Sequence, residues 1–378
     1  MDTLARLSTI DQTILTPLVQ QVLGRTSLRL LDWQVAPYGA GASRSVYRVA
    51  GHAEAQGTTL PWSLILKVAP VDGRLNPSGA SYWKREMLAY QSGLLADLPA
   101  GLVAPRCFGV VEHPGGGGWL WLEEITDVAV DRWSRERFTA VAHHMGSFSA
   151  AYLTGRPVPA YPWLSQGWFR GHVARAAAAV ARFPTLVDHP FLSPALPQDL
   201  APRVLRVIDE CALWLDVLDR LPQTFCHLDA FPRNLFVRTK DDQEVQLVLI
   251  DWDSAGVSAL GADLAALVGG SLLFGETELA TADALEQAVF ASYLSALRAA
   301  EWQGSAELVR QGYTIALVLH YVFVVLPVLV RGTENAAFRQ VVEQLMTRPY
   351  LAILERNAVL FAFLLARADE ARERLGSL

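Results

Sequence analysis

The residues whose types and spacing most strongly suggest a catalytic function lie between positions 227 and 251. His227 and Asp229 form a His-x-Asp pair, and Asn234 follows after four further residues. A second acid, Asp251, ends an apolar run that begins at Val245. Transfer of a phosphoryl group from ATP needs a carboxylate that orients an acceptor hydroxyl and takes its proton. It also needs hard oxygen ligands that hold magnesium (Mg²⁺) against the phosphates.

Each of these side chains suits one part of that chemistry. Asp229 suits the base, and Asn234 with Asp251 suits the Mg²⁺ ligands. His-x-Asp alone occurs by chance, and an Asp shortly before a Pro is usually a turn residue. A zinc site on His227 is a poor alternative, because no further ligands stand at suitable spacing. The predicted strand that ends at Asp251 favours the kinase interpretation, because order, spacing and local structure all match.

A kinase also needs a cation on a strand and an acid on a helix that positions this cation. Lys67 lies in an apolar run, so it is either an edge residue in solvent or a charge that faces a cleft. Glu86 follows nineteen residues later on a helix predicted over 81–95. Apolar residues share its face, which predicts a buried Glu86 with Lys67 as its partner. A solvated surface charge is the alternative for Glu86.

Two further segments are expected to contact a nucleotide through their backbones. A turn before the Lys67 strand carries glycines that would let N–H groups approach phosphates, although any hairpin could carry such a turn. The candidate residues there are Gly39, Gly41 and Ser43. Glu124 and Ile125 lie at the expected junction of two lobes, where an extended backbone could hydrogen-bond an adenine edge.

The elements that must position these residues change in character along the chain. Before about residue 126 the sequence predicts short strands, glycine-bearing turns and a prominent helix, whereas the later apolar period is helical almost throughout. We therefore expect an α+β fold of two lobes with a boundary near 123–127. Residues 1–126 would form a small β-rich nucleotide-binding lobe, and residues 127–378 a larger helical lobe for catalysis and substrate binding.

Taken together, these motifs resemble the aminoglycoside phosphotransferase and choline kinase-like family, which has a protein-kinase-like fold. The matching pieces are the turn at 39–49, Lys67, Glu86, the 227–234 motif and Ile250-Asp251-Trp252. The resemblance implies ATP and Mg²⁺ as cofactors, with Lys67 at the α- and β-phosphates and Glu86 as its brace. It also implies a structural role for His227 and makes Asp263 the acid that braces the catalytic loop.

Several positions depart from the protein-kinase pattern. Asp251 is followed by Trp-Asp instead of Phe-Gly, which fits the small-molecule group better. Phe231 stands where eukaryotic serine/threonine kinases carry Lys. Arg233 either supplies this missing positive charge or faces solvent. An aromatic loop, with Trp163, Trp168 and Phe169, either stacks on a sugar or anchors the core.

The expected activity is ATP- and Mg²⁺-dependent phosphorylation of a hydroxyl on a small molecule. Aminoglycosides, macrolides, amino sugars and related metabolites are the acceptor classes that the resemblance implies, and antibiotic resistance is one role that would follow. A kinase acting on a protein or peptide hydroxyl is an alternative. So is a non-catalytic binding module with a kinase fold, although the intact set of Lys67, Asp229, Asn234 and Asp251 argues against it.

Composition excludes several other classes. The net charge of −6 over 378 residues argues against a general nucleic-acid binder. Three scattered cysteines without a CxxC pair argue against a disulfide framework or a structural zinc site. The apolar stretch 314–330 falls short of the ~20 residues of a membrane span. It predicts a buried helix that ends or kinks just before Pro327. The first residues lack a secretory signal, and we expect the cytoplasm as the location.

Overall fold

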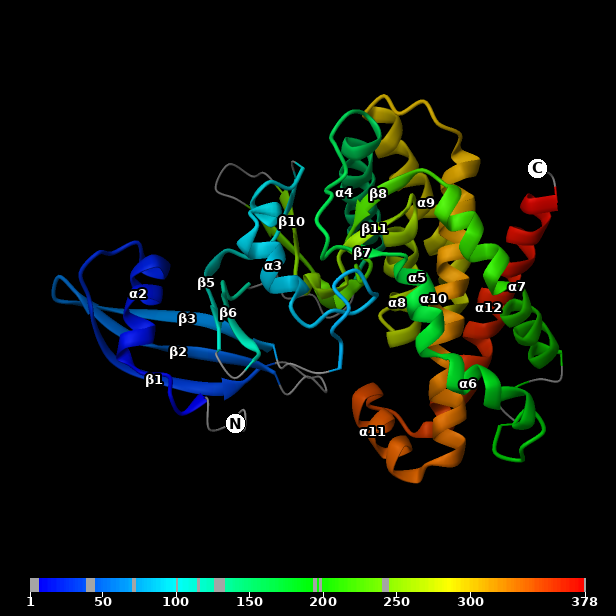
Figure 1. The fold of residues 1–378 in the computed structure, drawn as a ribbon, viewed down its shortest axis with the longest axis horizontal. Coiled ribbons are helices and arrows are strands. Elements are labelled where there is room, and N and C mark those ends of the chain that lie inside the picture. Colours follow the sequence, from blue (N-terminus) through cyan, green and yellow to red (C-terminus); the bar gives the residue numbers. More distant parts are fainter. Residues whose placement is uncertain are drawn as a thin grey trace.

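The computed structural model describes residues 7–38, 45–69, 73–99, 101–113, 116–125, 133–192, 196, 199–239 and 245–376. Figure 1 shows a β-rich N-terminal region beside a larger helical region, with strand β10 (Val245–Leu249) between them. This arrangement confirms the predicted α+β fold of two lobes. The predicted boundary, 123–127, falls after the last strand of the N-terminal sheet, and residues 126 and 127 lie outside the described residues.

The N-terminal lobe is built on a five-stranded antiparallel sheet in the order β1-β2-β3-β6-β5. Its strands are β1 (Arg29–Pro37), β2 (Val46–Ala55), β3 (Thr58–Ala69), β5 (Cys107–Glu112) and β6 (Gly118–Leu122). Lys67 pairs with Val46 of β2 and with Leu120 of β6. It therefore lies on a central strand, which excludes the sheet-edge alternative for this lysine.

Helix α2 (Gln12–Leu23) packs against β3 and β5. Its cap is Asp11, whose carboxylate accepts a hydrogen bond of 3.0 Å from the Ile14 N–H. Asp11 therefore satisfies one of the N–H groups that the first turn of the helix leaves free. The helix ends at Gly24, whose φ of 61° is left-handed.

Helix α3 (Arg85–Gln91) joins the two lobes and is shorter than the helix predicted over 81–95. Gly93, with φ of 78°, interrupts the helical run before the short 3₁₀ turn Leu94–Ala96. The buried side chains of α3 include Arg85 and Glu86, so a charged pair of residues faces the interior of the molecule.

Two small sheets contain the strands on either side of the 227–234 motif and of Asp251. One contains β4 (Leu102–Val103), β10 (Val245–Leu249) and β9 (Leu235–Thr239), and the other contains β7 (Ser165–Gln166), β11 (Gly256–Ala259) and β8 (Gln223–Cys226). Strands β9 and β10 pair antiparallel, and β10 is the strand predicted before Asp251. Strand β4 pairs in parallel with β10. A piece of the first 126 residues therefore belongs to the sheet that contains β9 and β10.

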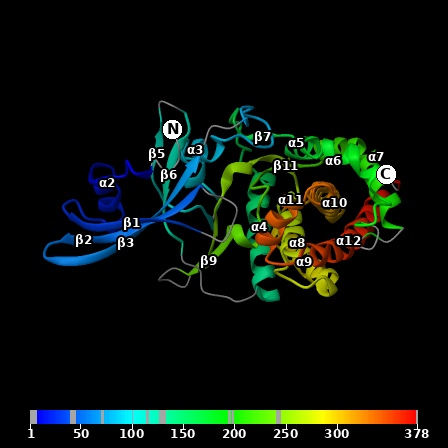
Figure 2. The same cartoon turned by 90° about the horizontal axis from the view of Figure 1, so that it is seen from below.

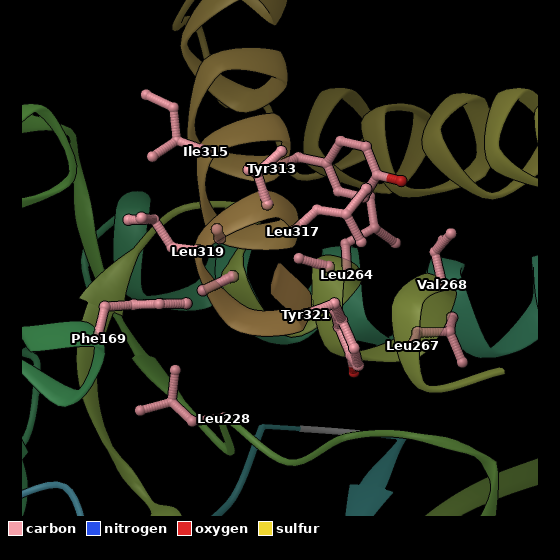
Figure 3. Packing of buried hydrophobic residues seen from close by; sticks show 14 of the residues in the cluster. Phe169, Leu228, Leu264, Leu267, Val268, Tyr313, Ile315, Leu317, Leu319 and Tyr321 are labelled. Carbon is pink, nitrogen blue, oxygen red and sulfur yellow. The ribbon is translucent and has the colours of Figure 1, made fainter. Parts of the chain in front are cut away.

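The remaining helices form the C-terminal lobe around α10. They are α4 (Arg135–Leu153), α5 (Trp168–Arg175), α6 (Ala177–Arg182), α7 (Leu200–Arg220), α8 (Ala262–Phe274), α9 (Ala282–Ala299), α10 (Ala306–Glu334), α11 (Ala336–Met346) and α12 (Tyr350–Gly376). Figure 2 views α10 almost along its axis, and α5, α6, α7, α8 and α12 all contact it. Figure 3 shows Leu317 and Tyr321 of α10 packed toward Leu264 of α8.

Helix α10 is the one helix among the described residues that is long and apolar enough to cross a membrane. It has 29 residues and continues through Pro327, which excludes a helix end before that proline, while the alternative of a kink stays a prediction. The missing N–H costs one hydrogen bond, but burial of apolar side chains on both sides of Pro327 keeps the helix running. Because 83% of its most apolar window is buried inside the molecule, α10 is the core helix of this lobe.

Candidate active site

The side chain of Lys67 joins the two lobes at one point. Its Nζ forms an ion pair with the Glu86 carboxylate and another, at 2.5 Å, with Asp251 Oδ1. The helix face therefore predicted the partner of Lys67 correctly. Burial alone would lower the pKa of Lys67, but Asp251 and Glu86 raise it above its ordinary value. The lysine is thus a fixed positive charge at neutral pH.

Glu86 also holds the segment that carries Asp251. Its Oε1 accepts a hydrogen bond of 3.3 Å from the Trp252 N–H. Burial raises the pKa of this carboxyl, and the Lys67 charge opposes the rise. The solvated-surface alternative for Glu86 is excluded, because this side chain is buried between the two lobes.

The Trp that replaces the Phe of the protein-kinase motif has a clear structural place. Trp252 is fully buried, and its Nε1–H donates a hydrogen bond of 2.9 Å to the Leu249 carbonyl. Its ring lies edge-on to the ring of His227, with centroids 4.6 Å apart. The aromatic side chain therefore connects the segment after β10 to the loop at 227–234, which is called the catalytic loop below because it carries the candidate base.

His227 connects the same two segments through hydrogen bonds. Its Nε2–H donates to the Ile250 carbonyl at 2.9 Å, and its Nδ1 accepts from the Asp229 N–H at 3.3 Å. Burial lowers the pKa of this imidazole to about 4, so it is neutral at pH 7. These contacts agree with the structural role that the resemblance implied.

Asp263 fixes the backbone of the catalytic loop. This buried carboxylate, at the start of α8, accepts from the N–H groups of His227 at 3.0 Å and Leu228 at 2.7 Å. Leu228 has a φ of 65°, a left-handed conformation that is costly for a residue with a branched side chain. The two hydrogen bonds stabilise this turn, which presents Asp229 to the cleft.

Asp229 and Asn234 lie in direct contact. Asn234 Nδ2 donates to the Asp229 carbonyl at 2.9 Å and to Asp229 Oδ2 at 3.0 Å. The amide nitrogen of Asn234 is therefore engaged by Asp229. Burial, with the charges of Asp251 and Asp253, raises the pKa of Asp229 well above its ordinary value. Such a shift makes a carboxylate a better proton acceptor.

The oxygen donors beside Asp229 fit Mg²⁺. The Ile250 N–H donates to the Asn234 carbonyl at 3.0 Å, which brings Asn234 next to Asp251. Asp253 lines the same cavity as Asp251. No group of three or more His, Cys, Asp and Glu side chains that could hold a metal occurs in the described part of the chain. Mg²⁺ does not require one, because it is typically held by one or two carboxylates, waters and substrate phosphates.

Two adjoining cavities meet at Lys67 and Asp251. One, of about 170 Å³, is mostly apolar and is lined by residues that include Ile65, Leu122, Ile125, Phe236 and Ile250. The other, of about 180 Å³, is charged and is lined by residues that include Lys67, Arg74, Asp251 and Asp253. An apolar space that leads into a charged one suits a nucleotide base followed by its phosphates.

The other residues that were predicted to contact the nucleotide lie in different places. Ile125 lines the apolar cavity, whereas the Glu124 side chain pairs with Arg48 at 2.7 Å and lines a different hollow. The backbone contacts expected of both residues stay a prediction. The three candidate residues of the turn after β1, Gly39, Gly41 and Ser43, lie outside the described residues.

The departures noted in the sequence also have structural outcomes. Phe231 stacks on Phe274, with ring centroids 5.1 Å apart. Arg233 packs over the Phe274 ring and pairs with Glu276 at 3.2 Å, although its side chain is 43% exposed. The aromatic loop residues Trp163, Trp168 and Phe169 are all buried, which favours core anchoring over sugar stacking.

Arg85 is a residue that sequence reasoning missed. Its side chain is completely buried, and its five N–H groups donate to five backbone carbonyls. The acceptors are the carbonyls of Pro77, Gly79, Ala80, Trp163 and Asp253. No acidic partner marks such a site in a sequence, because carbonyl dipoles surround the charge. Burial lowers the pKa of Arg85 to about 10, so it stays charged at pH 7.

A two-lobed fold with a lysine braced by a helical glutamate, a His-x-Asp loop and a second acid after a strand defines a kinase-like phosphotransferase. Residues 34–302 match the model of the phosphotransferase enzyme family (APH), and the chain belongs to this family. It is therefore a phosphotransferase with an alcohol group as acceptor. The search of curated proteins finds no match.

Solved structures of the same fold cover almost the whole chain. The amicoumacin kinase hAmiN, in complex with AMP-PNP, Ca²⁺ and Ami, is 13% identical with a TM-score of 0.51, and the match covers 92% of this chain and 97% of that one. An aminoglycoside phosphotransferase from Alicyclobacillus acidocaldarius is 14% identical, with a TM-score of 0.51 and coverage of 94% and 96%. The ethanolamine kinase of Plasmodium vivax is 11% identical, with a TM-score of 0.50 and coverage of 89% and 83%.

Proposed function

We propose that this protein transfers the γ-phosphoryl group of ATP to a hydroxyl of a small molecule, with Asp229 as the base. The observation that carries the proposal is the position of Lys67, which contacts Glu86 and Asp251 where the apolar and charged cavities meet. A nucleotide with its base in the apolar cavity would extend its phosphates toward this lysine. The complex of the amicoumacin kinase with AMP-PNP supports the use of ATP.

Each residue of the site has its own role in the proposed reaction. Asp229 accepts the proton of the acceptor hydroxyl, whose oxygen forms a new bond to the γ-phosphorus. The bond from this phosphorus to the β,γ-bridging oxygen breaks, and its electron pair leaves with ADP. Lys67 holds the α- and β-phosphates, while Asn234 and Asp251 would hold Mg²⁺. When bound, Mg²⁺ offsets the negative charge of the phosphates.

A small hydroxylated acceptor is supported by the family and by the departures from protein kinases. The Trp-Asp sequence after Asp251 and the absence of an Ala-Pro-Glu motif beyond it fit the small-molecule group. Structural neighbours named as amicoumacin and aminoglycoside kinases are consistent with such an acceptor. Aminoglycosides, macrolides, amino sugars and related metabolites therefore form the panel to be tested.

The test measures acceptor-dependent ADP formation with MgATP over a panel of hydroxylated antibiotics, amino sugars and metabolites. We expect at least one acceptor to raise turnover above the basal rate, with a phosphorylated product detected by mass spectrometry. The matched control, Asp229→Asn, keeps the side-chain volume and should abolish the rise. Failure of the wild-type protein to bind MgATP would overturn the proposal, and so would phosphorylation confined to peptides and proteins.

A further inference from the structure

We propose that Arg74 is a further catalytic residue, whose guanidinium binds the phosphoryl group during its transfer. The inference rests on the proposed function and adds a specific contact to it. Arg74 lies in the segment between β3 and α3 and lines the charged cavity of about 180 Å³ with Lys67, Asp251 and Asp253. Its Nη1 lies 3.8 Å from Asp253 Oδ2. Both side chains are 40% exposed, so the guanidinium has access to that cavity.

The site needs a positive charge at the γ-phosphoryl group that its other cations do not supply. Lys67 is held between the carboxylates of Glu86 and Asp251. The loop position that carries Lys in many protein kinases is Phe231, which packs on Phe274. Arg233 is engaged with Glu276 and Phe274. Arg74 shares a cavity with the candidate metal ligand Asp251.

Residues 74–83, within the segment that carries Arg74, are held in place by hydrogen bonds. Arg85 donates to three carbonyls of this segment, those of Pro77, Gly79 and Ala80. The Trp83 N–H donates to the Arg74 carbonyl at 3.3 Å. The segment is also fixed to the C-terminal lobe, because the Gln166 N–H donates to the Ser78 carbonyl at 2.9 Å.

The packing of this segment against α5 leaves little space for movement. Ala80 approaches Gly171 so closely that a Cβ at position 171 would lie 2.7 Å from the Cβ of Ala80. A glycine is therefore required at this point of α5. The base of the segment thus behaves as part of the C-terminal lobe, and Arg74 keeps its place relative to the catalytic loop.

The Arg85 side chain contacts both the segment that carries Arg74 and the segment of Asp251 and Asp253. Its Nη1 donates to the Asp253 carbonyl at 2.6 Å, while the other donors hold the Arg74 segment and the Trp163 carbonyl. A planar guanidinium has fixed donor directions, so it fixes these backbones relative to each other. Arg85 is therefore a positioning residue for the phosphate end of the site, and Arg74 is the residue that contacts the phosphoryl group.

The chemistry explains why an arginine suits this position. As the bond to the acceptor oxygen forms and the bond to ADP breaks, negative charge lies on the oxygens of the phosphoryl group. A guanidinium offers two parallel N–H donors to such oxygens. A contact that is stronger in the transition state than with bound ATP raises kcat with little effect on ATP affinity.

The experiment measures binding of a transition-state mimic and does not need a known acceptor. The wild-type protein and the Arg74→Ala, Arg74→Lys and Arg29→Ala variants are titrated with MgAMP-PNP, with MgADP and with MgADP plus aluminium fluoride. Arg29 is the matched control, because it removes the same charge from an exposed pair with Glu54 on the far strands of the N-terminal lobe. Thermal unfolding of each variant establishes that it is folded.

We expect Arg74→Ala to weaken binding of the ADP and aluminium fluoride complex by about 10²-fold, with AMP-PNP affinity changed by less than about threefold. Arg74→Lys should lie between the two, since it keeps the charge and loses the planar pair of donors. Arg29→Ala should match the wild type with every ligand.

Two results would overturn the inference. One is mimic binding by Arg74→Ala that equals that of Arg29→Ala, and the other is a wild-type protein that binds the mimic no more tightly than MgADP. Both leave the proposed function standing as long as the wild type binds MgAMP-PNP. Absence of MgAMP-PNP binding in the wild type overturns the proposed function itself, and Arg74 with it.

Discussion

The carboxylate of Asp263 accepts a hydrogen bond of 2.7 Å from the N–H of Leu228, the residue directly before the candidate base. Leu228 is left-handed at a φ of 65°, so the loop bends sharply at this point. A buried acid on one helix therefore sets the direction from which Asp229 enters the cleft. The stability of this arrangement depends on pH, because burial raises the pKa of Asp263 to about 6.

The first prediction concerns the pH dependence of unfolding. The pKa of an Asp in the unfolded chain is about 3.9, so the folded protein binds the proton more tightly. The stabilising contribution of protonated Asp263 is fully present below about pH 4 and is lost as the pH rises through about 6. Asp263→Asn cannot titrate, so wild-type stability minus variant stability should fall by about 3 kcal/mol over this range.

Urea unfolding at several pH values between 4 and 7 measures this difference. Groups such as Glu86 titrate in both proteins and cancel in the comparison. Stability curves that run parallel for the two proteins would show that Asp263 does not titrate between these values.

The second prediction separates chemistry from binding at Asp229. Asp229→Asn removes the proton acceptor, so turnover should fall by about 10²–10⁴-fold. The affinity for MgATP should persist, because a base acts in the transition state and contributes little to nucleotide binding. Steady-state kinetics and calorimetric titration on the same preparation test this expectation. Near wild-type turnover would remove Asp229 from the role of base.

The third prediction uses the contact between Lys67 and Glu86. Lys67→Ala should lower kcat/KM for ATP sharply, because it removes the charge that holds the α- and β-phosphates. Glu86→Ala should have a smaller effect, since Glu86 acts on the nucleotide through Lys67. The double variant should be little worse than Lys67→Ala alone, because residues that act as a unit are not additive. Additive losses would show that the two act independently.

The fourth prediction tests Asp251 as a Mg²⁺ ligand. Asp251→Asn replaces a carboxylate by an amide, which balances less of the metal's charge. We expect ATP affinity to fall more in the presence of Mg²⁺ than in its absence. Binding titrations of the wild type and the variant, each with Mg²⁺ and with EDTA, provide the comparison. Equal losses in both conditions would indicate that Asp251 acts through its ion pair with Lys67.

The sequence alone allowed much of the candidate site to be predicted. Lys67 and Glu86 lie on different elements, yet the residue types, their order and the face of one helix indicated their contact. Asp229, Asn234 and Asp251 were assigned by the spacing of one loop and one strand. In each case the signal was local, and the fold needed only to bring two such pieces together.

The parts that escaped prediction depend on contacts without a local signature. Arg85 is surrounded by backbone carbonyls from three segments, and no residue type marks a carbonyl that points at a guanidinium. Helix α8 is buried along nearly its whole length, so its apolar residues show no clear helical period. Pro327 indicated a helix end or a kink, and the end did not occur because burial of its neighbours in the core outweighed one lost hydrogen bond.

The burial of α10 has a consequence for how the protein is made. This helix is as apolar as a membrane segment, and α12, the last helix in the sequence, packs along it. Before residues 350–376 have been synthesised, the side of α10 that α12 covers has no partner and exposes apolar side chains. Chains that lack α12 are therefore expected to aggregate.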